Sequence, residues 1–265
     1  MTPDPGFAPA KINLTLHVTG RRADGYHLLD SVVAFADLGD RLTAGPGDGL
    51  TVTGPFAQGV PTDDTNLIRR ALDMAGAPRA VVLEKNLPHP GGIGGGSSDA
   101  AAALRLVGAV LPTEALLRLG ADLPVCVAAR AARMRGIGER VDPLTLPPLP
   151  AVLLHPGLDC PTGAVFSALA SPDNPGQAAV PERSDAPTFL RWLAAQRNDL
   201  EPPAMSAAPG IAAALDALRG TGAALARMSG SGATCFGIYD SPEAARAAAA
   251  RLDRPGWWVR ATTLT

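Results

Sequence analysis

The sequence has no long apolar run, no excess of positive charge and few cysteines, and each of these shortages excludes a class of protein. Its longest apolar stretches, such as residues 151–154, are far too short to span a bilayer. The N-terminus lacks the basic and apolar segments that together mark a secretory signal. We therefore expect a protein without a membrane partner that works in the cytoplasm.

Cysteine and lysine are both scarce. The three cysteines, Cys126, Cys160 and Cys235, are odd in number and lack metal-ligand spacing, which indicates reduced core thiols rather than disulfides or a zinc site. The formal net charge of −2 offers no broad basic surface for nucleic acid. Only two of the 23 basic residues are lysines, Lys11 and Lys85, so a lysine inside a motif is informative. Chemistry on a small molecule is the function class that remains.

What the sequence does contain is an alternation of strand-like and helical segments, which is typical of an α/β or α+β protein. With 265 residues, of which 46% are hydrophobic, the chain suffices for one large domain or two ordinary ones. Prolines at residues 146–150 precede a new strand-like run, so we expect two domains, at residues 1–150 and 151–265. Residues 171–187 are predicted to form a flexible surface loop.

Residues 10–18 alternate strictly between apolar and polar side chains, which predicts a strand with one buried face. The other face then carries a row of polar residues: Lys11, Asn13, Thr15 and His17. Such a row is either an ordinary solvated face or the polar wall of a site.

Turn signals place three further polar residues. Tyr26 and His27 follow a turn at residues 24–25, and the residues alone favour half-buried packing side chains there. Asp122 comes just after the glycine that ends a predicted helix, so we expect it in a turn outside regular structure.

Capping residues predict where two helices begin. The pattern at residues 66–76 is helical, and Asp64 or Thr65 is the predicted N-cap. A stronger helix is predicted at residues 100–111, and three neighbouring residues are competent to cap it: Ser97, Ser98 and Asp99.

A glycine-rich loop at residues 88–98 leads directly into this stronger helix. Bare backbone before a helix N-terminus allows N–H groups to converge on an anion, with the positive end of the helix dipole behind them. The loop lacks the lysine of the Walker motif and the third glycine of the dinucleotide fingerprint. A hairpin or linker without a ligand is the alternative. A second glycine cluster, at residues 228–239, favours a plain turn by itself, but with the first it suggests two loops closing on one polyphosphate.

Three motifs together resemble those of the GHMP kinase superfamily: PAKINL at 9–14, PHPGGIGGGSSDAA at 88–101 and MSGSGAT at 228–234. Within it, GRRADGYHLLDS at 20–31 and PTGAVF at 161–166 are similar to the subgroup that acts on 4-diphosphocytidyl-2-C-methyl-D-erythritol. The resemblance runs nearly from end to end. It implies a two-domain fold with an N-terminal ribosomal-protein-S5-like domain and a C-terminal ferredoxin-like domain.

The resemblance also implies an activity: ATP-dependent phosphorylation of the substrate's 2-hydroxyl, in the non-mevalonate route to isoprenoid precursors. Asp122 would be the catalytic base, and Lys11 would pair with it. Mg²⁺ would accompany ATP and meet Ser98 or its neighbour Ser97. The residues implied around the ATP phosphates are Pro88, Gly91, Gly92, Gly94, Gly95, Gly96, Ser97 and Ser98.

Further contacts follow from matching positions. Asn66, Leu67 and Lys85 would surround adenosine, although Asn66 is equally well explained as the start of a helix. The residues implied for the cytidyl substrate are Asn13, Tyr26, His27, Thr162, Phe166, Ser229 and Gly230. Packing in the core is the alternative for Phe166. Within the loop, Ile93 replaces the usual leucine and Pro90 removes one N–H donor.

Two other functions remain open at this point. The chain could be another GHMP kinase, acting on homoserine, mevalonate or a sugar, or a non-catalytic nucleotide-binding protein with the same fold. A monomer and a homodimer are both compatible with the sequence, and so are an open or a closed position of loop 171–187 over the substrate.

Overall fold

The computed structural model describes residues 4–181 and 183–265. Its strands are β1 (Phe7–Asn13), β2 (His17–Arg21), β3 (His27–Gly45), β4 (Gly49–Thr53), β5 (Ala80–Glu84), β6 (Ala132–Gly136), β7 (Arg140–Pro143), β8 (Leu149–His155), β9 (Leu225–Met228), β10 (Cys235–Ile238) and β11 (Trp258–Leu264). Its helices are α1 (Leu67–Met74), α2 (Gly95–Leu106), α3 (Thr113–Leu119), α4 (Leu123–Ala128), α5 (Thr162–Ser167), α6 (Ala186–Ala194), α7 (Glu201–Ala207), α8 (Gly210–Gly220) and α9 (Pro242–Leu252).

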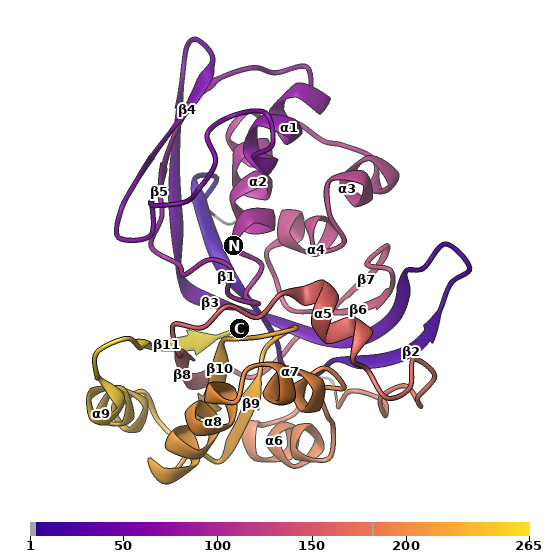
Figure 1. The fold of residues 1–265 in the computed structure, drawn as a ribbon, viewed down its shortest axis with the longest axis vertical. Coiled ribbons are helices and arrows are strands. Elements are labelled where there is room, and N and C mark those ends of the chain that lie inside the picture. Colours follow the sequence, from indigo (N-terminus) through magenta and orange to yellow (C-terminus); the bar gives the residue numbers. More distant parts are fainter. Residues whose placement is uncertain (1–3, 182) are drawn as a thin grey trace.

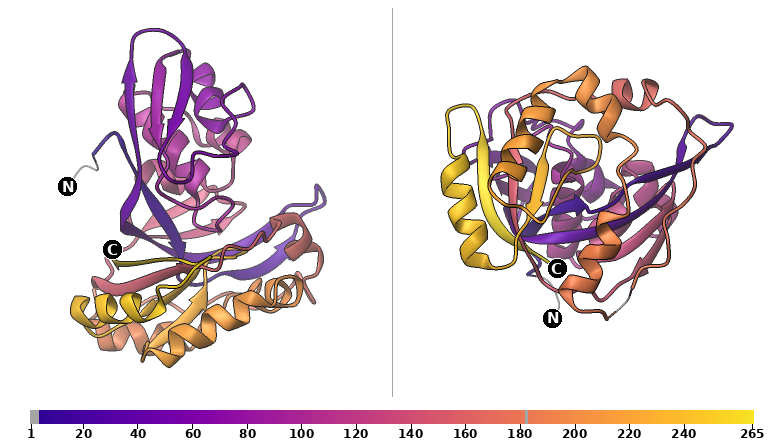
Figure 2. Two further views of the ribbon diagram at one scale, coloured as in Figure 1. Left: turned by 60° about the vertical axis from the view of Figure 1, so that its left-hand side comes forward. Right: turned by 90° about the horizontal axis from the view of Figure 1, so that it is seen from below.

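The strands form one mixed sheet with the long strand β3 as its spine. β3 pairs with β1, β2, β5, β6 and β11, and from β11 the sheet continues through β8 and β10 to β9. Helices α1–α4 gather in one half of the molecule and α6–α9 in the other, with the curved β3 between them (Figure 1). In the second half, the helices lie as a layer against the strands (Figure 2). This arrangement confirms the expected mixed α/β class.

The strand predicted at residues 10–18 is divided into β1 and β2, with a break at residues 14–16. At the break the Thr15 hydroxyl, rather than a backbone carbonyl, accepts a hydrogen bond from the N–H of Val32 at 2.8 Å. The polar face is not solvated, because Lys11 and His17, like the residues between them, are almost completely buried. The interpretation as a solvated face is therefore wrong, and the polar row lies inside the protein.

Helix α2 begins earlier than the serine caps predict. Its N-cap is Gly94, which has the left-handed conformation, with φ of 65°, that favours glycine. Ser97 and Ser98 consequently lie within the first turn of the helix instead of before it. The prediction of a serine or aspartate cap is wrong at this helix.

The other caps also differ from expectation. Helix α1 is capped by Asn66, whose side-chain oxygen accepts the N–H of Ile68 at 2.8 Å. Thr65 is instead turned toward Asp63, to which its N–H and hydroxyl both donate. Asp122 lies in a turn, as expected, and is the N-cap residue of α4, a helix that the sequence analysis did not predict.

The predicted division near residue 150 coincides with the start of β8. One hydrophobic cluster nevertheless crosses it, since Ile12 packs in the same cluster as Phe189. The sheet crosses it as well, because β11 pairs with β3. Domains at residues 1–150 and 151–265 therefore stay a prediction.

Two compositional expectations can be compared with the structure. Cys126, Cys160 and Cys235 are all buried and unpaired, which confirms the prediction of core thiols. In the part of the chain that the structure describes, no helix combines the length and the apolar character needed to cross a bilayer.

Candidate active site

One large cavity, of about 820 Å³, opens where the end of β1, the glycine loop, α4 and α5 meet. The predicted site residues on its wall are Lys11, Asn13, Tyr26, His27, Gly92, Gly94, Ser97, Asp122, Thr162, Phe166 and Gly230. Wall residues that the sequence analysis did not single out include Arg21, Leu29, Ile137, Pro172 and Ser231. Its volume and its few polar groups suit a small-molecule ligand.

Lys11 and Asp122 form an ion pair at one end of this cavity, with 2.8 Å between Nζ and Oδ2. Lys11 projects from β1 and is buried, whereas the Asp122 side chain is 30% exposed at the start of α4. The Lys11 ammonium also donates to Oδ1 of Asn13 at 2.7 Å. The geometry therefore fixes the ammonium from two sides and leaves part of the carboxylate facing the cavity.

Asn13 is itself held in place by its neighbours. Its Nδ2 donates to the Ser31 hydroxyl at 2.8 Å, and that hydroxyl donates to the Thr15 carbonyl. An amide whose nitrogen has a fixed acceptor must turn its oxygen toward Lys11. Asn13 is therefore positioned to orient the ion pair, and its contact with a substrate stays a prediction.

The N-terminus of α2 faces the same end of the cavity. The first helical hydrogen bond runs from the N–H of Ser98 to the Gly94 carbonyl, so the N–H groups of residues 95–97 precede it and are free of helical partners. A Cβ on Gly94 would lie 3.1 Å from the Lys11 side chain. A bare backbone at Gly94 lets the helix start pack against the Lys11 side chain, and the helix start and the ammonium together create a positive end suited to phosphate.

The two glycine clusters touch each other. A Cβ on Gly92 would lie 2.4 Å from the carbonyl oxygen of Gly232, closer than side-chain atoms can approach. The hydroxyl and N–H of Thr234 donate to the Gly91 carbonyl, and Asn198 donates to the Gly230 carbonyl at 2.9 Å. The structure thus brings the loops together, as expected, while their joint binding of a polyphosphate stays a prediction.

Ser229 has a different position from the one predicted. It is completely buried, and its hydroxyl accepts the N–H of Asn13 and donates to the Gly92 carbonyl, both at 3.0 Å. The expected substrate contact is corrected accordingly: Ser229 ties β1 to both glycine loops. Its neighbours Gly230 and Ser231 are the residues of this loop that reach the cavity.

Lys85 also differs from expectation, because its ammonium is enclosed within the protein. It is 2% exposed and forms ion pairs with Asp40 at 2.5 Å and with Asp99 at 2.8 Å. A Cβ on Gly95 would lie 3.1 Å from Nζ, so the ammonium lies directly behind the start of α2. The side chain supports the glycine loop from inside rather than reaching an adenosine from outside.

Asp99 is the most strongly perturbed acid of this cluster. Burial, offset in part by the Lys85 charge and reinforced by Asp40, raises the pKa of Asp99 to about 8. One of its carboxylate oxygens has no hydrogen-bond partner among the described residues. A proton on Asp99 therefore reduces the net negative charge beneath the loop.

The Ser98 hydroxyl is not available to bind a metal ion that accompanies the ATP phosphates. It is 1% exposed, and its hydroxyl donates to the Cys126 sulfur at 3.5 Å. The prediction of Ser98 as a metal ligand is therefore corrected. On the wall at this end, Ser97 and Asp122 carry side-chain oxygens, as does Asn13, whose oxygen accepts from Lys11. No group of three metal-binding side chains occurs within residues 4–181 and 183–265, so these residues fit Mg²⁺ only when phosphates and water supply its other ligands.

The remaining residues predicted around ATP lie beside the glycine loop and off the cavity wall. Asn66 uses its amide locally, since Oδ1 caps α1 and Nδ2 donates to the Pro61 carbonyl at 2.7 Å. Leu67 lies 3.6 Å from the position of a Cβ on Gly96. The buried Pro88 turns its carbonyl toward Gly91. Their contact with adenosine stays a prediction.

The other end of the cavity is aromatic. His27 stacks on Phe166 of α5, with ring centroids 4.7 Å apart and an interplanar angle of 23°. Tyr26 is 58% exposed, so the interpretation as a half-buried packing residue is wrong. Thr162 shares a 2.7 Å hydrogen bond with Ser231, which joins α5 to the second glycine loop. Burial, and then the charge of Arg21, lowers the pKa of His27, which favours a neutral imidazole here.

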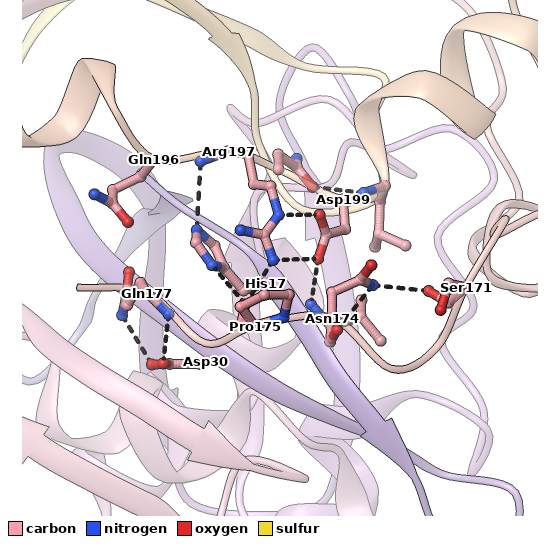
Figure 3. A network of polar contacts seen from close by, with 12 residues as sticks. His17, Asp30, Ser171, Asn174, Pro175, Gln177, Gln196, Arg197 and Asp199 are labelled. Atoms are coloured by element: carbon pink, nitrogen blue, oxygen red, sulfur yellow. Dashed lines mark hydrogen bonds and ion pairs between the residues drawn. The ribbon is translucent and has the colours of Figure 1, made fainter.

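Residues 171–177, named here the strap, are hydrogen-bonded to residues of β2 and β3 (Figure 3). The backbone N–H and Nε2 of Gln177 donate to the Asp30 carboxylate at 3.1 and 2.8 Å, and Nδ2 of Asn174 donates to the Val18 carbonyl at 3.1 Å. Pro172 reaches the cavity wall. The expected free surface loop is therefore corrected for this part, which is hydrogen-bonded to β2 and β3.

His17 connects the strap to the segment after α6 (Figure 3). Its Nε2 accepts the N–H of Arg197, so Nδ1 carries the proton and donates to the Pro175 carbonyl, both at 3.3 Å. Burial, and then the charge of Arg197, lowers the pKa of His17. The strap is therefore fixed by a neutral imidazole.

Comparison with known families and proteins fits this geometry. Residues 65–133 match the model described as GHMP kinases N terminal domain, and residues 177–256 match GHMP kinases C terminal. The chain is 56% identical to the 4-diphosphocytidyl-2-C-methyl-D-erythritol kinase of Dinoroseobacter shibae, over 99% of this chain and 95% of that protein. It is 55% identical to the protein of the same name from Paracoccus denitrificans, over 97% and 95%.

Solved structures show the same likeness. A crystal structure of 4-(cytidine 5'-diphospho)-2C-methyl-D-erythritol kinase superimposes with a TM-score of 0.78 at 38% identity, covering 97% of this chain and 98% of that one. The homoserine kinase of Cytophaga hutchinsonii superimposes with a TM-score of 0.60 at 20% identity, covering 98% and 93%, and so shares the fold alone.

Proposed function

The chain belongs to the GHMP kinase family and is a small-molecule kinase, and we propose that it phosphorylates the 2-hydroxyl of 4-diphosphocytidyl-2-C-methyl-D-erythritol. ATP is the co-substrate, and the products are the 2-phosphate and ADP. The observation that carries the proposal is the cavity itself, which places the Lys11–Asp122 pair at one end and the His27–Phe166 stack at the other. The reaction is a step toward isoprenoid precursors by the non-mevalonate route.

Asp122 acts as the general base. Its partly exposed carboxylate accepts the proton of the 2-hydroxyl as that oxygen attacks the γ-phosphorus of ATP. The new oxygen–phosphorus bond forms while the bond to the β–γ bridging oxygen breaks, and ADP leaves. Lys11 stabilises the negative charge that develops on the attacking oxygen and the transferring group. Asn13 keeps the Lys11 ammonium in place through the 2.7 Å hydrogen bond.

The phosphates of ATP bind at the start of α2. The free N–H groups of residues 95–97 and the helix dipole favour an anion there. The second glycine loop supports this one from behind through the backbone contact at Gly92. Adenosine then lies on the far side of the loop from the cavity, near Asn66 and Leu67. Ser97 and Asp122 are the side chains that would hold the Mg²⁺ accompanying ATP, and the ion would neutralise phosphate charge.

The aromatic end of the cavity receives the cytidine. Tyr26, His27 and Phe166 offer ring faces for stacking, and a neutral imidazole has both a donor and an acceptor for the base edge. Thr162 and Gly230 lie between the two ends. The proposal also includes a cytoplasmic location and a monomeric or homodimeric state. It includes no nucleic-acid or membrane partner.

The test is ADP release from the purified protein with Mg-ATP and each of four acceptors: the cytidyl substrate, mevalonate, homoserine and galactose. We expect turnover with the cytidyl substrate alone, and inhibition of that turnover by CMP. Turnover with another acceptor and no response to CMP would overturn the substrate assignment while keeping the kinase chemistry of Lys11 and Asp122. ATP binding without turnover of any acceptor would favour the non-catalytic alternative.

A further inference from the structure

Arg21, at the end of β2, is a cation on the cavity wall without an acidic partner. Besides Arg21, the wall carries the charged side chains of Lys11 and Asp122, which pair with each other, and the imidazole of His27. Arg21 is exposed, and within residues 4–181 and 183–265 it forms no ion pair. Its Nε donates to the Gly25 carbonyl at 3.2 Å, while its terminal nitrogens have no hydrogen-bond partner among the same residues. A fixed guanidinium therefore has free donors.

The strand register places this guanidinium beside the aromatic end of the cavity. Arg21 pairs directly with His27 across β2 and β3, and residues opposite each other in an antiparallel pair project from the same face. The charge of Arg21 also acts on the imidazole, as a secondary cause of the lowered pKa of His27. The cation is thus next to the His27–Phe166 stack and at the opposite end from the catalytic pair.

The next residue shows that position, rather than charge alone, distinguishes Arg21. Arg22 follows it in the same hairpin, but its guanidinium forms a 2.7 Å ion pair with Asp24 and does not line the cavity. The chain therefore contains a matched control one residue away.

We propose that Arg21 binds the phosphate groups adjoining the nucleoside of the substrate, and so selects a nucleoside diphosphate over an uncharged acceptor. The inference rests on the proposed function, since it takes the aromatic end as the nucleoside site. A nucleoside stacked there carries its 5′-phosphate one ribose away from the base, within the region that the guanidinium flanks. Arginine binds phosphate through paired N–H donors, and among the described residues no ion pair occupies those of Arg21.

Charge balance along the wall supports the same assignment. The Lys11 charge is offset by Asp122, so Arg21 supplies the uncompensated positive charge of the cavity. A diphosphate bridge between a base at the aromatic end and a hydroxyl at the catalytic end needs such a cation near its nucleoside side. Arg21 is a specificity-determining residue in this role and takes no part in phosphoryl transfer.

The test compares binding of cytidine, CMP and CDP to the wild-type protein, Arg21→Gln and Arg22→Gln by isothermal titration calorimetry. We expect Arg21→Gln to weaken the binding of CMP and CDP by roughly 10- to 100-fold, because a charged hydrogen bond to phosphate is lost. The affinity for cytidine should not change. Arg22→Gln should bind all three as the wild type does. Arg21→Lys should recover part of the loss, and circular dichroism checks that each variant is folded.

Two results would overturn the assignment without touching the proposed function. If Arg21→Gln binds CDP as tightly as the wild type, Arg21 has no phosphate contact. If it loses cytidine and CDP affinity equally, Arg21 contacts the nucleoside instead. If the wild-type protein binds none of the three compounds, the proposed function fails and the role of Arg21 fails with it. In turnover assays with the cytidyl substrate, Arg21→Gln should raise KM and leave kcat within about threefold.

Discussion

His27 of β3 and Phe166 of α5 stack with their ring centroids 4.7 Å apart, although they come from opposite sides of the predicted domain boundary near residue 150. The separation leaves no room for a third ring between them. A cytosine at this end of the cavity therefore either stacks on an outer face of the pair or displaces one ring. Phe166 contributes apolar contact to a base that stacks on its own outer face or that enters between the two rings.

Phe166→Ala should weaken CMP binding by roughly tenfold, since stacking of a base on an aromatic ring contributes about 1–3 kcal/mol. The KM for ATP should not change, because Phe166 lies at the far end of the cavity from the glycine loop. Phe166→Tyr keeps the ring and serves as the matched control. Equal CMP affinity in Phe166→Ala and wild type would remove Phe166 from the base site.

Asp122→Asn should lower kcat by roughly 10²- to 10⁴-fold, because an amide cannot accept the proton of the substrate hydroxyl. The KM for ATP should change much less. Asn13 still holds the Lys11 ammonium in this variant, so the fold should persist, and circular dichroism with thermal melting checks this. A folded Asp122→Asn protein with nearly normal kcat contradicts the assignment of Asp122 as the base.

Asp99→Asn should be well tolerated and should gain stability relative to the wild type as the pH rises. The pKa of Asp99 is raised from its ordinary 3.8 to about 8, chiefly by burial. Its contribution to stability is therefore complete below pH 3.8 and is lost as the pH rises toward 8, a loss that an amide does not share. Melting temperatures should agree within about 3 °C at pH 5 and favour Asp99→Asn at pH 8.

Lys85→Met is the contrasting variant in this cluster. It leaves Asp40 and Asp99 buried without their shared cation, which should cost about 3–5 kcal/mol of unfolding free energy in urea titrations. A Lys85→Met protein as stable as the wild type would contradict the charge arrangement described for the loop. So would a difference in melting temperature between Asp99→Asn and wild type that narrows as the pH rises.

His17→Gln should reduce the pH dependence of stability. The pKa of His17 is lowered by burial and then by Arg197, so the unfolded chain binds its proton more readily than the native protein. The stability due to the neutral imidazole is present above pH 6.5 and is lost as the pH falls below it. From pH 7.5 to 5.5 the melting temperature of His17→Gln should therefore fall less than that of the wild type. His155, whose pKa burial also lowers, is present in both proteins, so equal slopes would exclude His17 as the cause.

The sequence predicted the parts of the site that depend on short-range patterns. Glycines before a strong helix indicated an anion site, and period-two alternation identified the polar row that begins at Lys11. Resemblance to a family then paired Lys11 with Asp122, and the structure places these side chains in contact. Arg21 was missed because the sequence does not distinguish it from the adjoining Arg22. The register of β2 with β3 places Arg21 opposite His27 on the cavity wall, whereas Arg22 pairs with Asp24.

The wrong predictions share a physical cause. Ser98 was assigned to Mg²⁺ and Ser229 to the substrate because the family resemblance implied those contacts. In the fold both hydroxyls are buried and bond to protein atoms: the Cys126 sulfur in one case, and the backbone of Asn13 and Gly92 in the other. Lys85 was expected near adenosine, yet two aspartates from β3 and α2 enclose its ammonium. Each error concerns a contact between residues far apart in the chain.

The sequence by itself determined the class of fold, the family and the kind of chemistry, because these depend on periodicity, glycine placement and motif spacing along the chain. Only the tertiary structure decided which polar side chains face the cavity and which are used inside the protein. A donor or ammonium that leaves water must find a partner, and that partner is chosen by how strands pair and helices pack. Lys11 and Lys85 illustrate the difference: both are buried and ion-paired, but only the partner of Lys11 faces the cavity.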